Sequence, residues 1–381
     1  MDFALSEEHK MIQAVTRDLA VKRLAPLADE LDRRQEFAMD NFKAMAELGI
    51  TGLGIPNEYG GSGGDHLSLV VAMEEIAWAC AATADILDAH LCLCAQPIYA
   101  YGSEGQRSKF VAPLTRGDNI GSFAVTESEA GSDIGAIKST AVRDGDSYIL
   151  NGTKVFMTLG DVSDIGVVFA NVPELGTRGM TAFIVEKDMV GFSRDKKYDK
   201  LGMRAATNAD FVFEDCRVPV ANRLGQEGQG MRICLAALDN GRIGIAAQAI
   251  GITRAVLEKA IEYSRERTQF GIPISQNQAI GWMLADIATQ LEAARFLAYK
   301  AAVSADRGEP FTVYAAMAKL TASELCMHAS TQGIQIFGGY GYMMDSPMQR
   351  YFRDAKLTTI YEGTSEIQRM IISRSLLRGV H

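Results

Sequence analysis

Residues 147–158 read Ser-Tyr-Ile-Leu-Asn-Gly-Thr-Lys-Val-Phe-Met-Thr, and they exclude an all-helical protein. Aliphatic and aromatic residues lie on both sides of Asn151-Gly152 and favour β-strands. Asparagine and glycine tolerate the positive φ angles of a type I′ turn. The stretch therefore predicts a β-hairpin whose turn is Asn151-Gly152.

Short strands continue after this stretch, and helical patterns lie on both sides of them. Strands are expected at residues 165–170, 181–185 and 210–213, and helices at 231–267, 276–305, 311–337 and after Gly363. Several short strands with turn signals between them indicate a compact antiparallel β-domain. The predicted fold class is α+β, mainly α. It has an N-terminal helical domain (residues 1–120), a central antiparallel β-domain (121–225) and a C-terminal four-helix-type bundle (226–381).

Composition narrows the range of functions. The chain has 381 residues, with 38 basic and 47 acidic side chains, which gives a net charge of −9. This acidic balance argues against a nucleic-acid partner, and no stretch is apolar for long enough to insert into a membrane. The N-terminus lacks the apolar region of a targeting segment, so a cytoplasmic protein of bacterial type is expected. The scattered cysteines and histidines predict no metal site.

Several common catalytic motifs are missing from the sequence. There is no GxGxxG after a strand, no GxxxxGK[ST] phosphate loop, no HExxH and no GxSxG. Each of these motifs has a defined chemical task in nicotinamide binding, nucleotide hydrolysis, zinc hydrolysis or serine hydrolysis. The sequence therefore argues against all four activities.

Four other segments carry polar and aromatic groups in positions suited to chemistry. They are Phe123-Ala-Val-Thr-Glu-Ser-Glu-Ala-Gly-Ser-Asp133, Asn151-Gly-Thr-Lys-Val-Phe-Met-Thr158, Arg265-Glu-Arg-Thr-Gln-Phe-Gly-Ile-Pro-Ile274 and Ile360-Tyr-Glu-Gly-Thr-Ser-Glu-Ile-Gln368. The first is a strand end leading into a Gly/Ser turn, whose backbone N–H groups suit a flavin edge and a phosphate. The last places Glu362 on a loop before a helix, where a carboxylate can project into a cavity.

In this order and at these distances, the four segments resemble the acyl-CoA dehydrogenase family. The resemblance covers essentially the whole chain and includes Gln335-Ile-Phe-Gly-Gly-Tyr-Gly-Tyr342 and Arg353-Asp-Ala-Lys356. It implies the domain order predicted above, FAD as the cofactor, and an acyl-CoA thioester as the substrate. It also implies a homotetramer built as a dimer of dimers, which passes electrons to electron-transfer flavoprotein.

The resemblance assigns roles to individual residues. Those implied to bind FAD are Phe123, Val125, Thr126, Gly131, Ser132, Phe156, Thr158, Arg267, Gln269, Phe270, Gln278, Gln335, Gly338, Gly339, Thr364 and Glu366. Among them, Arg267, Gln269 and Phe270 resemble a segment that reaches the FAD of a neighbouring subunit. The residues implied to bind substrate are Ser132, Asp239, Arg242 and Gly363.

The family chemistry gives Glu362 the role of general base. A thioester α-proton is weakly acidic, so it leaves only if the developing enolate charge is stabilised by hydrogen bonds. Burial beside an acyl chain is expected to raise the pKa of Glu362 towards the working pH. The resemblance implies that Glu362 takes the α-proton while the β-hydride passes to flavin N5. Some family members carry the base at the position of Gly241, which has no side chain here.

Asp85 and Asp88 interrupt an otherwise apolar helix, residues 81–98, which lines the acyl pocket in the family. One interpretation is that one or both face solvent or cap a local kink. The other places Asp88 in the acyl cavity as a second acid or base. A buried carboxylate beside an alkyl chain would be unfavourable, but it would suit a polar or alicyclic acyl group. That second interpretation predicts a cyclohexane- or cyclohexene-carboxyl-CoA substrate rather than a short- or medium-chain one.

Three alternatives keep the same scaffold. Acyl-CoA oxidases pass electrons to O₂, but their chains are generally much longer. Nitroalkane oxidase uses an aspartate as its base, where this chain has Glu362. A non-catalytic flavoprotein would need no base, and the presence of Glu362 argues against that role.

Overall fold

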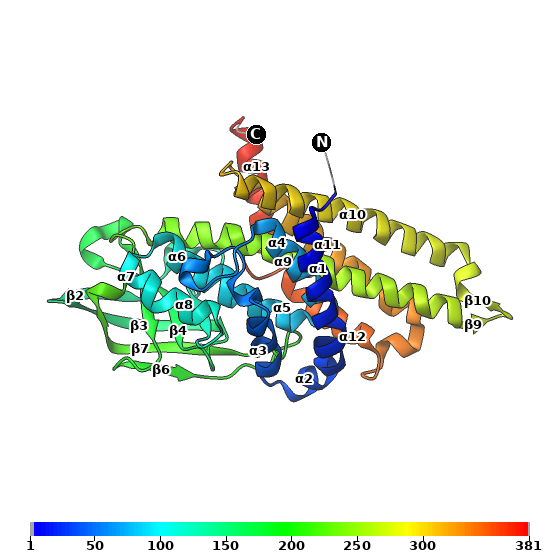
Figure 1. The fold of residues 1–381 in the computed structure, drawn as a ribbon, viewed down its shortest axis with the longest axis horizontal. Helices are drawn as coiled ribbons and strands as arrows, with labels where there is room; N and C mark the ends of the chain where they lie inside the picture. The colour runs from blue at the N-terminus through cyan, green and yellow to red at the C-terminus, as the bar shows by residue number, and fades with distance from the viewer. Residues whose placement is uncertain (1–3, 380–381) are drawn as a thin grey trace.

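The computed structural model describes residues 4–379, which form helices, then a sheet, then helices (Figure 1). The N-terminal α-helices are α1 (Glu7–Leu19), α2 (Ala28–Arg34), α3 (Met39–Glu47), α4 (His66–Ala79), α5 (Ala81–Leu87), α6 (Gln96–Tyr101), α7 (Glu104–Gln106) and α8 (Ala112–Thr115). Three π-helical segments join them: η1 (Ala20–Leu24), η5 (Asp88–Ala95) and η6 (Arg107–Val111). Short 3₁₀ turns are η2 (Ala25–Leu27), η3 (Ile50–Gly52) and η4 (Asn57–Tyr59).

The local sequence explains where the helices nearest the site begin and end. Asp65 caps α4, because its side chain accepts hydrogen bonds from the backbone N–H and the hydroxyl of Ser68, both at 2.7 Å. Cys80 has an extended backbone and separates α4 from α5. The chain can therefore turn back on itself, so that α4 and α5 are in contact.

The central sheet contains β1 (Gly121–Ala124), β2 (Thr140–Asp144), β3 (Ser147–Thr158), β4 (Ile165–Asn171), β5 (Met180–Glu186), β6 (Phe192–Asp195), β7 (Asn208–Pro219) and β8 (Arg223–Leu224). Its strand order is β6-β7-β3-β2-β4-β5-β8, and β1 pairs with β4. Most neighbours are antiparallel, as expected, but β1 and β2 both pair parallel with β4. The sheet is thus mixed at the strand that leads to the predicted flavin turn. The remaining 3₁₀ turns of this region are η7 (Ile134–Ala136), η8 (Pro173–Arg178) and η9 (Val220–Asn222).

The predicted hairpin turn at Asn151-Gly152 is wrong. Residues 147–158 form the single strand β3, which pairs with β2 on one side and with β7 on the other. The register with β7 shifts between Leu150 and Gly152, which marks a β-bulge. A Cβ at Gly152 would lie 2.3 Å from Ser139 Oγ, so the glycine permits a close approach rather than a turn. The turn between β2 and β3 contains Gly145, at φ 60°.

The C-terminal helices are α9 (Gly230–Glu266), α10 (Gln278–Asp306), α11 (Thr312–Phe337), α12 (Pro347–Thr358) and α13 (Ser365–Leu377). The two longest, α9 and α10, run lengthways along the molecule, whereas α13 projects across that direction (Figure 1). A small hairpin, β9 (Thr268–Gln269) and β10 (Ile272–Pro273), follows α9, and 3₁₀ turns lie at η10 (Ile274–Gln276) and η11 (Gly338–Tyr342). The four predicted helices are confirmed to within two residues at their starts, whereas α12 was not predicted. In Figure 1 the hairpin lies at the end of the molecule opposite the sheet.

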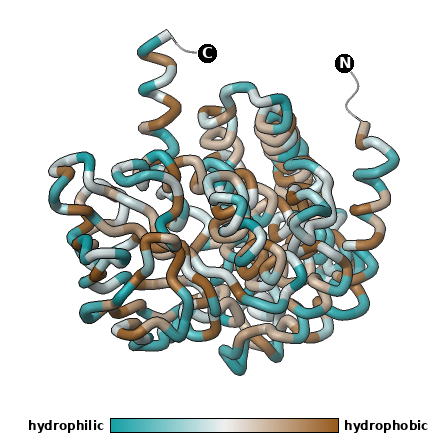
Figure 2. The backbone as a smooth tube through the Cα atoms, turned by 60° about the vertical axis from the view of Figure 1, so that its left-hand side comes forward, coloured by the Kyte–Doolittle hydropathy of each residue, from teal (hydrophilic) through white to brown (hydrophobic). Residues whose placement is uncertain are grey.

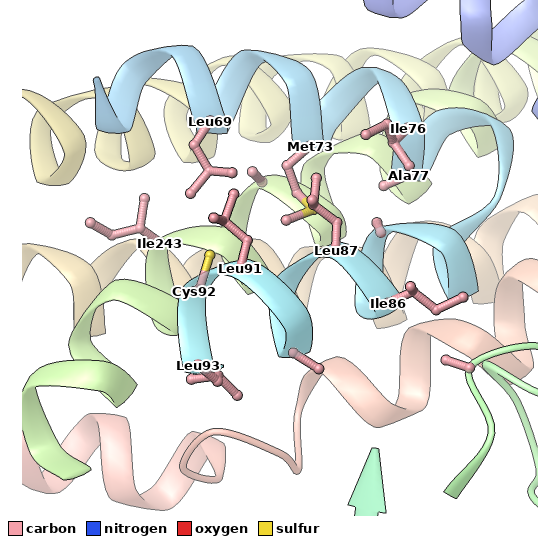
Figure 3. Close-up of a cluster of buried hydrophobic side chains, with 14 of the residues drawn as sticks. Leu69, Met73, Ile76, Ala77, Ile86, Leu87, Leu91, Cys92, Leu93 and Ile243 are labelled. Atoms are coloured by element: carbon pink, nitrogen blue, oxygen red, sulfur yellow. The ribbon is translucent and has the colours of Figure 1, made fainter. Parts of the chain in front are cut away.

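The main core lies where α4, α5, η5 and α9 pack together. Figure 3 shows Leu69 and Met73 of α4 pointing towards Leu91 of η5, and all three are buried. Hydrophobic segments run through the middle of the molecule and hydrophilic ones follow the outer turns (Figure 2). Despite this apolar interior, no helix within residues 4–379 is both long and apolar enough to span a bilayer.

A buried histidine fixes η5 to the sheet. His90 is fully buried, its Nε2 lies 3.0 Å from Leu114 O, and Gly121 N–H donates to its Nδ1 at 3.0 Å. This pattern requires a neutral ring with its proton on Nε2. Burial lowers the pKa of His90 to about 4. Because Gly121 begins β1, the histidine sets the position of that strand against η5.

This histidine makes the folded state sensitive to acid. Its folded pKa lies below its ordinary value of 6.5, so its contribution to stability is complete above pH 6.5 and is lost as the pH falls towards 4. The loss reaches roughly 3 kcal/mol. His90→Ala is expected to lower the unfolding free energy at pH 7 by about 2–3 kcal/mol and to flatten this acid dependence. Denaturant unfolding at several pH values, with the exposed His328→Ala as control, measures both effects. An unchanged slope in His90→Ala would contradict the assignment.

Candidate active site

Glu362 lies in the short loop between α12 and α13. Its backbone is left-handed at φ 52°, and the next residue, Gly363, has φ 93°. Thr364 then caps α13, because its hydroxyl accepts a hydrogen bond from Ile367 N–H at 3.3 Å. A left-handed non-glycine residue is strained by about 1–3 kcal/mol and persists only where its surroundings impose it. The loop thus holds the Glu362 side chain in one direction.

Two bare positions on α9 receive two carboxylates. A Cβ at Gly241 would lie 1.9 Å from Glu362 Oε2, and a Cβ at Gly244 would lie 2.0 Å from Asp88 Oδ1. Residues three apart on a helix share a face, so the two carboxylates lie side by side against α9. Neither Glu362 Oε2 nor either carboxylate oxygen of Asp88 has a hydrogen-bond partner among residues 4–379 with the pair taken as ionised.

The Asp88 and Glu362 carboxylates change each other's pKa. Burial raises the pKa of Asp88 well above its usual range, and the neighbouring Glu362 charge raises it further. Burial also raises the pKa of Glu362, but a hydrogen bond from Asp88 and the charges of Lys319 and Arg242 oppose that rise. Two buried carboxylates that lie side by side cannot both ionise readily, so the pair holds one proton over a wide pH range. A protonated Asp88 donating to ionised Glu362 is the favoured state.

Asp85 extends this acidic cluster by one helical turn. Asp85 is 3% exposed and Asp88 1% exposed, so the interpretation that these aspartates face solvent is wrong. The reason is that every residue of α5 and η5 is buried, because this segment packs against α4, α9 and β1. Burial raises the pKa of Asp85 to about 7, and the nearby Lys200 opposes the rise. Asp88 is the first residue of η5, and π-helical turns occur frequently at functional sites.

The predicted flavin residues of the sheet region lie at the ends of β1 and β3, and β1 packs against η5, which carries Asp88. Phe123 and Val125 are buried at the end of β1, Thr126 is half-buried, and Gly131 and Ser132 are exposed in the following turn. Phe156 is 57% exposed with φ 67°, and Thr158 ends β3. Thr364 and Glu366 begin α13, directly after Glu362.

Two polar residues of β7 that the sequence reasoning missed hold the end of β3. Phe156 N–H donates to Asp210 Oδ1 at 3.2 Å, and Asn208 Nδ2 donates to Phe156 O at 2.7 Å. Asn208 also reaches Thr158 Oγ1 at 3.2 Å and accepts from Lys200 Nζ at 2.6 Å. Asn208 and Asp210 lie on either side of Ala209, directly before the apolar run at residues 211–213, which is the sequence signal that could have found them.

The other predicted flavin residues lie at the far end of the helical region. Arg267 ends α9 with its guanidinium over the Tyr340 ring at 5.4 Å, and Phe270 is fully exposed at φ 52°. This group also contains Gln269, Gln278, Gln335, Gly338 and Gly339, all of them exposed. The β9–β10 hairpin, which carries Gln269 and Phe270 of this group, lies at the end of the molecule opposite the sheet (Figure 1). Within one chain, the two groups of predicted flavin residues are therefore not brought together.

Three of the four predicted substrate residues are linked to Glu362 by a contact or by their position in the chain. Arg242 is buried, donates to Asp239 Oδ1, and lies with its Nε 3.4 Å from Glu362 O. Asp239 also accepts from Thr312 Oγ1 at 2.6 Å. Gly363 adjoins the base, whereas Ser132 is exposed in the turn after β1. Arg242 thus contacts the backbone of the base loop, a role the sequence did not indicate.

The residues present suit a flavin. Phe156 offers an exposed ring on a rigid strand, and rings of this kind stack on flat aromatic surfaces. Ser365 Oγ, beside Thr364, and Gln332 Oε1, one turn before Gln335, are buried without a hydrogen-bond partner in the described chain. Unpaired buried polar atoms are expected to meet a ligand or water. Both groups therefore have free hydrogen-bonding capacity where FAD contacts were predicted.

A buried carboxylate on a fixed loop suits the removal of a proton from carbon, and the exposed Phe156 ring suits a flavin. Family models for the N-terminal, middle and C-terminal domains of acyl-CoA dehydrogenases match residues 6–118, 122–216 and 228–377. The chain belongs to the acyl-CoA dehydrogenase family and is an FAD-dependent acyl-CoA dehydrogenase.

Individual relatives cover nearly the whole chain. It is 46% identical to the short-chain specific acyl-CoA dehydrogenase of Clostridium acetobutylicum, over 99% of this chain and 100% of that protein. It is 48% identical to the NADH-dependent acryloyl-CoA reductase of Anaerotignum propionicum, over 99% and 96%. A chain in a solved structure of the electron transferring flavoprotein of Acidaminococcus fermentans is 47% identical, with a TM-score of 0.98 over 99% of this chain and 100% of that one.

Proposed function

We propose that this acyl-CoA dehydrogenase acts on an alicyclic carboxyl-CoA thioester, with the Glu362–Asp88 pair as its base. Bound FAD supplies the acceptor for the hydride that leaves the substrate. Glu362 takes the α-proton of a saturated thioester, because its carboxylate is buried and its backbone is fixed. Apart from a protonated Asp88, no residue within 4–379 donates a hydrogen bond to its Oε2. Arg242, Lys319 and Gln368 hold the loop that presents it.

The observation that carries the alicyclic proposal is the Asp88 carboxylate. Asp88 is 1% exposed, and its Oδ1 and the Met73 side chain both lie beside Gly244 of α9. The neighbouring residues Leu87 and Leu91 belong to the apolar cluster of Figure 3. Burying a carboxyl group beside a plain alkyl chain costs several kcal/mol without compensation. The burial of this carboxylate has a function if Asp88 acts as a base that removes a proton from a ring carbon of the substrate.

The two carboxylates would remove protons from different carbons of the substrate. A saturated ring carries a hydrogen on the α-carbon, so Glu362 can remove it, and the loss of one proton and one hydride creates one C=C bond. A cyclohex-1-ene-carboxyl thioester has no α-hydrogen, so its proton must come from a carbon further round the ring. Asp88, beside Glu362 along α9, is a base displaced from the α-carbon position. Because the pair holds one proton, either member can be the ionised one.

A straight short-chain acyl-CoA is the second candidate, and the relatives favour it. The Clostridium relative is named short-chain specific, and the Anaerotignum relative is named for the reduction of acryloyl-CoA. Reduction is the reverse direction, so similarity alone does not fix the direction of use.

Two partners belong to the proposal. The similarity to a chain in the Acidaminococcus electron transferring flavoprotein structure supports electron-transfer flavoprotein as the acceptor. The two groups of predicted FAD-binding residues are separated within one chain. This separation supports a second copy of the chain, whose β9–β10 hairpin completes each FAD site. A homotetramer, as a dimer of dimers, supplies such copies in pairs.

Anaerobic titration of the purified flavoprotein with acyl-CoA thioesters tests the function. The panel contains butyryl, octanoyl, isobutyryl, glutaryl, cyclohexanecarboxyl and cyclohex-1-enecarboxyl thioesters, and loss of flavin absorbance is the measurement. Rapid bleaching by the two cyclic members is expected. Bleaching by butyryl-CoA alone would return the protein to short-chain oxidation, and no bleaching by any thioester would contradict the dehydrogenase activity proposed for this site.

A further inference from the structure

The loop that carries Glu362 is held by three side chains from three different helices. Gln368 of α13 donates to Glu362 O at 3.2 Å and to Gly363 O at 2.7 Å. Lys319 of α11 donates to Gly363 O at 2.8 Å, and Arg242 of α9 reaches Glu362 O. The two consecutive carbonyls thus meet three donors, which explains how a left-handed Glu362-Gly363 pair is maintained.

Lys319 differs from the other two donors in its situation. Its side chain is fully buried, and Gly363 O is its one hydrogen-bond acceptor among the contacts of residues 4–379. A buried ammonium with so few acceptors is unfavourable, because each of its three N–H groups loses water. Burial accordingly lowers the pKa of Lys319 to about 8, and the Glu362 carboxylate is the largest influence that opposes this. A glutamine or a methionine would fill the same space at less cost.

We propose that Lys319 is a positioning residue for the general base: it fixes the Glu362-Gly363 turn from beneath, and its charge keeps Glu362 ionised beside Asp88. This inference rests on the proposed role of Glu362. Gln368 already donates to Gly363 O, so a hydrogen bond alone does not require a lysine. What Lys319 adds is a positive charge in a low-dielectric region that contains two carboxylates.

The charges around Glu362 indicate in which direction its pKa should change when the Lys319 charge is removed. The ionisable groups that act on Glu362 and Lys319 are Asp88 and Cys92 of η5, Asp85 of α5, Arg242 of α9, Glu324 of α11, Glu366 of α13 and Tyr361 of the loop itself. Lys319 and Arg242 lower the pKa of Glu362 against the effect of burial. Removal of the Lys319 charge is therefore expected to raise the pKa of Glu362 and to move the acid limb of kcat/KM to higher pH.

A matched pair of variants separates charge from hydrogen bonding. Lys319→Met and Gln368→Leu each remove one donor to Gly363 O, but only the first removes a charge. Lys319→Met is expected to move the acid limb up by about one pH unit, which is about a tenfold loss of kcat/KM below the limb. Gln368→Leu is expected to lower kcat without moving the limb. Ser323→Ala, four residues after Lys319 on the buried face of α11, controls for disturbance of that helix.

The outcomes divide cleanly. An acid limb that moves in Lys319→Met and stays in Gln368→Leu and Ser323→Ala supports the inference. An unmoved limb in Lys319→Met overturns it, and so does an equal shift in Gln368→Leu, because the hydrogen bond would then be responsible. Lys319→Gln, measured in parallel, gives the charge effect if the methionine variant loses its flavin. Failure of the proposed function is distinct, since the wild-type flavin would then be bleached by butyryl-CoA alone or by no thioester, whereas the acid limb is compared on a thioester that the wild type oxidises.

Discussion

Glu362→Gln is expected to lower kcat for saturated acyl-CoA thioesters by about 10³-fold. The amide keeps the shape of the side chain and its place against Gly241, but it cannot accept the α-proton. Binding of the thioester should persist, because Arg242 and Gln368 still hold the loop through backbone carbonyls. Stopped-flow measurement of flavin bleaching by cyclohexanecarboxyl-CoA and butyryl-CoA gives the rate, and the spectral shift on ligand binding gives the affinity.

Gly241→Ala provides a control that moves the base without changing its chemistry. The new Cβ would lie 1.9 Å from Glu362 Oε2, so the carboxylate must shift. A displacement of about 1 Å typically costs about 10²-fold in rate, which is less than complete loss of the base. Retention of more than a tenth of the wild-type rate in Glu362→Gln would show that another group takes the proton from saturated substrates.

The sequence was sufficient for the order of the helical and sheet regions and for the placement of Glu362 on a loop before a helix. The helices after residue 230 have long proline-free apolar patterns, which is why their limits agree with α9, α10 and α11. Glu362 could be found because its loop precedes a helix cap and matches a family segment. None of this required knowledge of side-chain packing.

Asn151-Gly152 shows why local signals failed in the sheet. The dipeptide suits a type I′ turn, but a glycine inside a strand can equally serve a bulge or a close contact. Only the side chain of Ser139, thirteen residues before Gly152, decides between them, because it occupies the space that a Cβ at Gly152 would take. A contact of that kind leaves no periodic trace in the sequence.

Lys319 and Asp88 illustrate a second limit. A single lysine in an Ala-rich helix is normally exposed, so nothing marked Lys319 as buried beneath the base loop. For Asp88, the direction of the side chain depends on the π-helix η5, which changes the register of the following residues relative to an α-helix. Helical periodicity of 3.6 residues therefore could not assign its face.

The second large effect is expected for Asp88→Asn, which should separate ring substrates from chains. Asparagine can still donate a hydrogen bond to Glu362, and the pair already carries one negative charge, so the Glu362 carboxylate should remain ionised at neutral pH. Oxidation of butyryl-CoA should therefore stay within about tenfold of wild type. Cyclohex-1-enecarboxyl-CoA has no α-hydrogen for Glu362, and its rate should fall by about 10³-fold.

Gly244→Ala tests the same carboxylate through its position. The added Cβ would lie 2.0 Å from Asp88 Oδ1, just as alanine at 241 displaces Glu362. The two alanine variants stand one helical turn apart on α9, so they disturb the helix alike but move different carboxylates. Gly244→Ala should slow the cyclohexene thioester by about 10²-fold and spare butyryl-CoA, whereas Gly241→Ala should slow butyryl-CoA. If Asp88→Asn and Gly244→Ala leave both substrates unchanged, Asp88 takes no proton, and its burial would serve only to hold Glu362 in place.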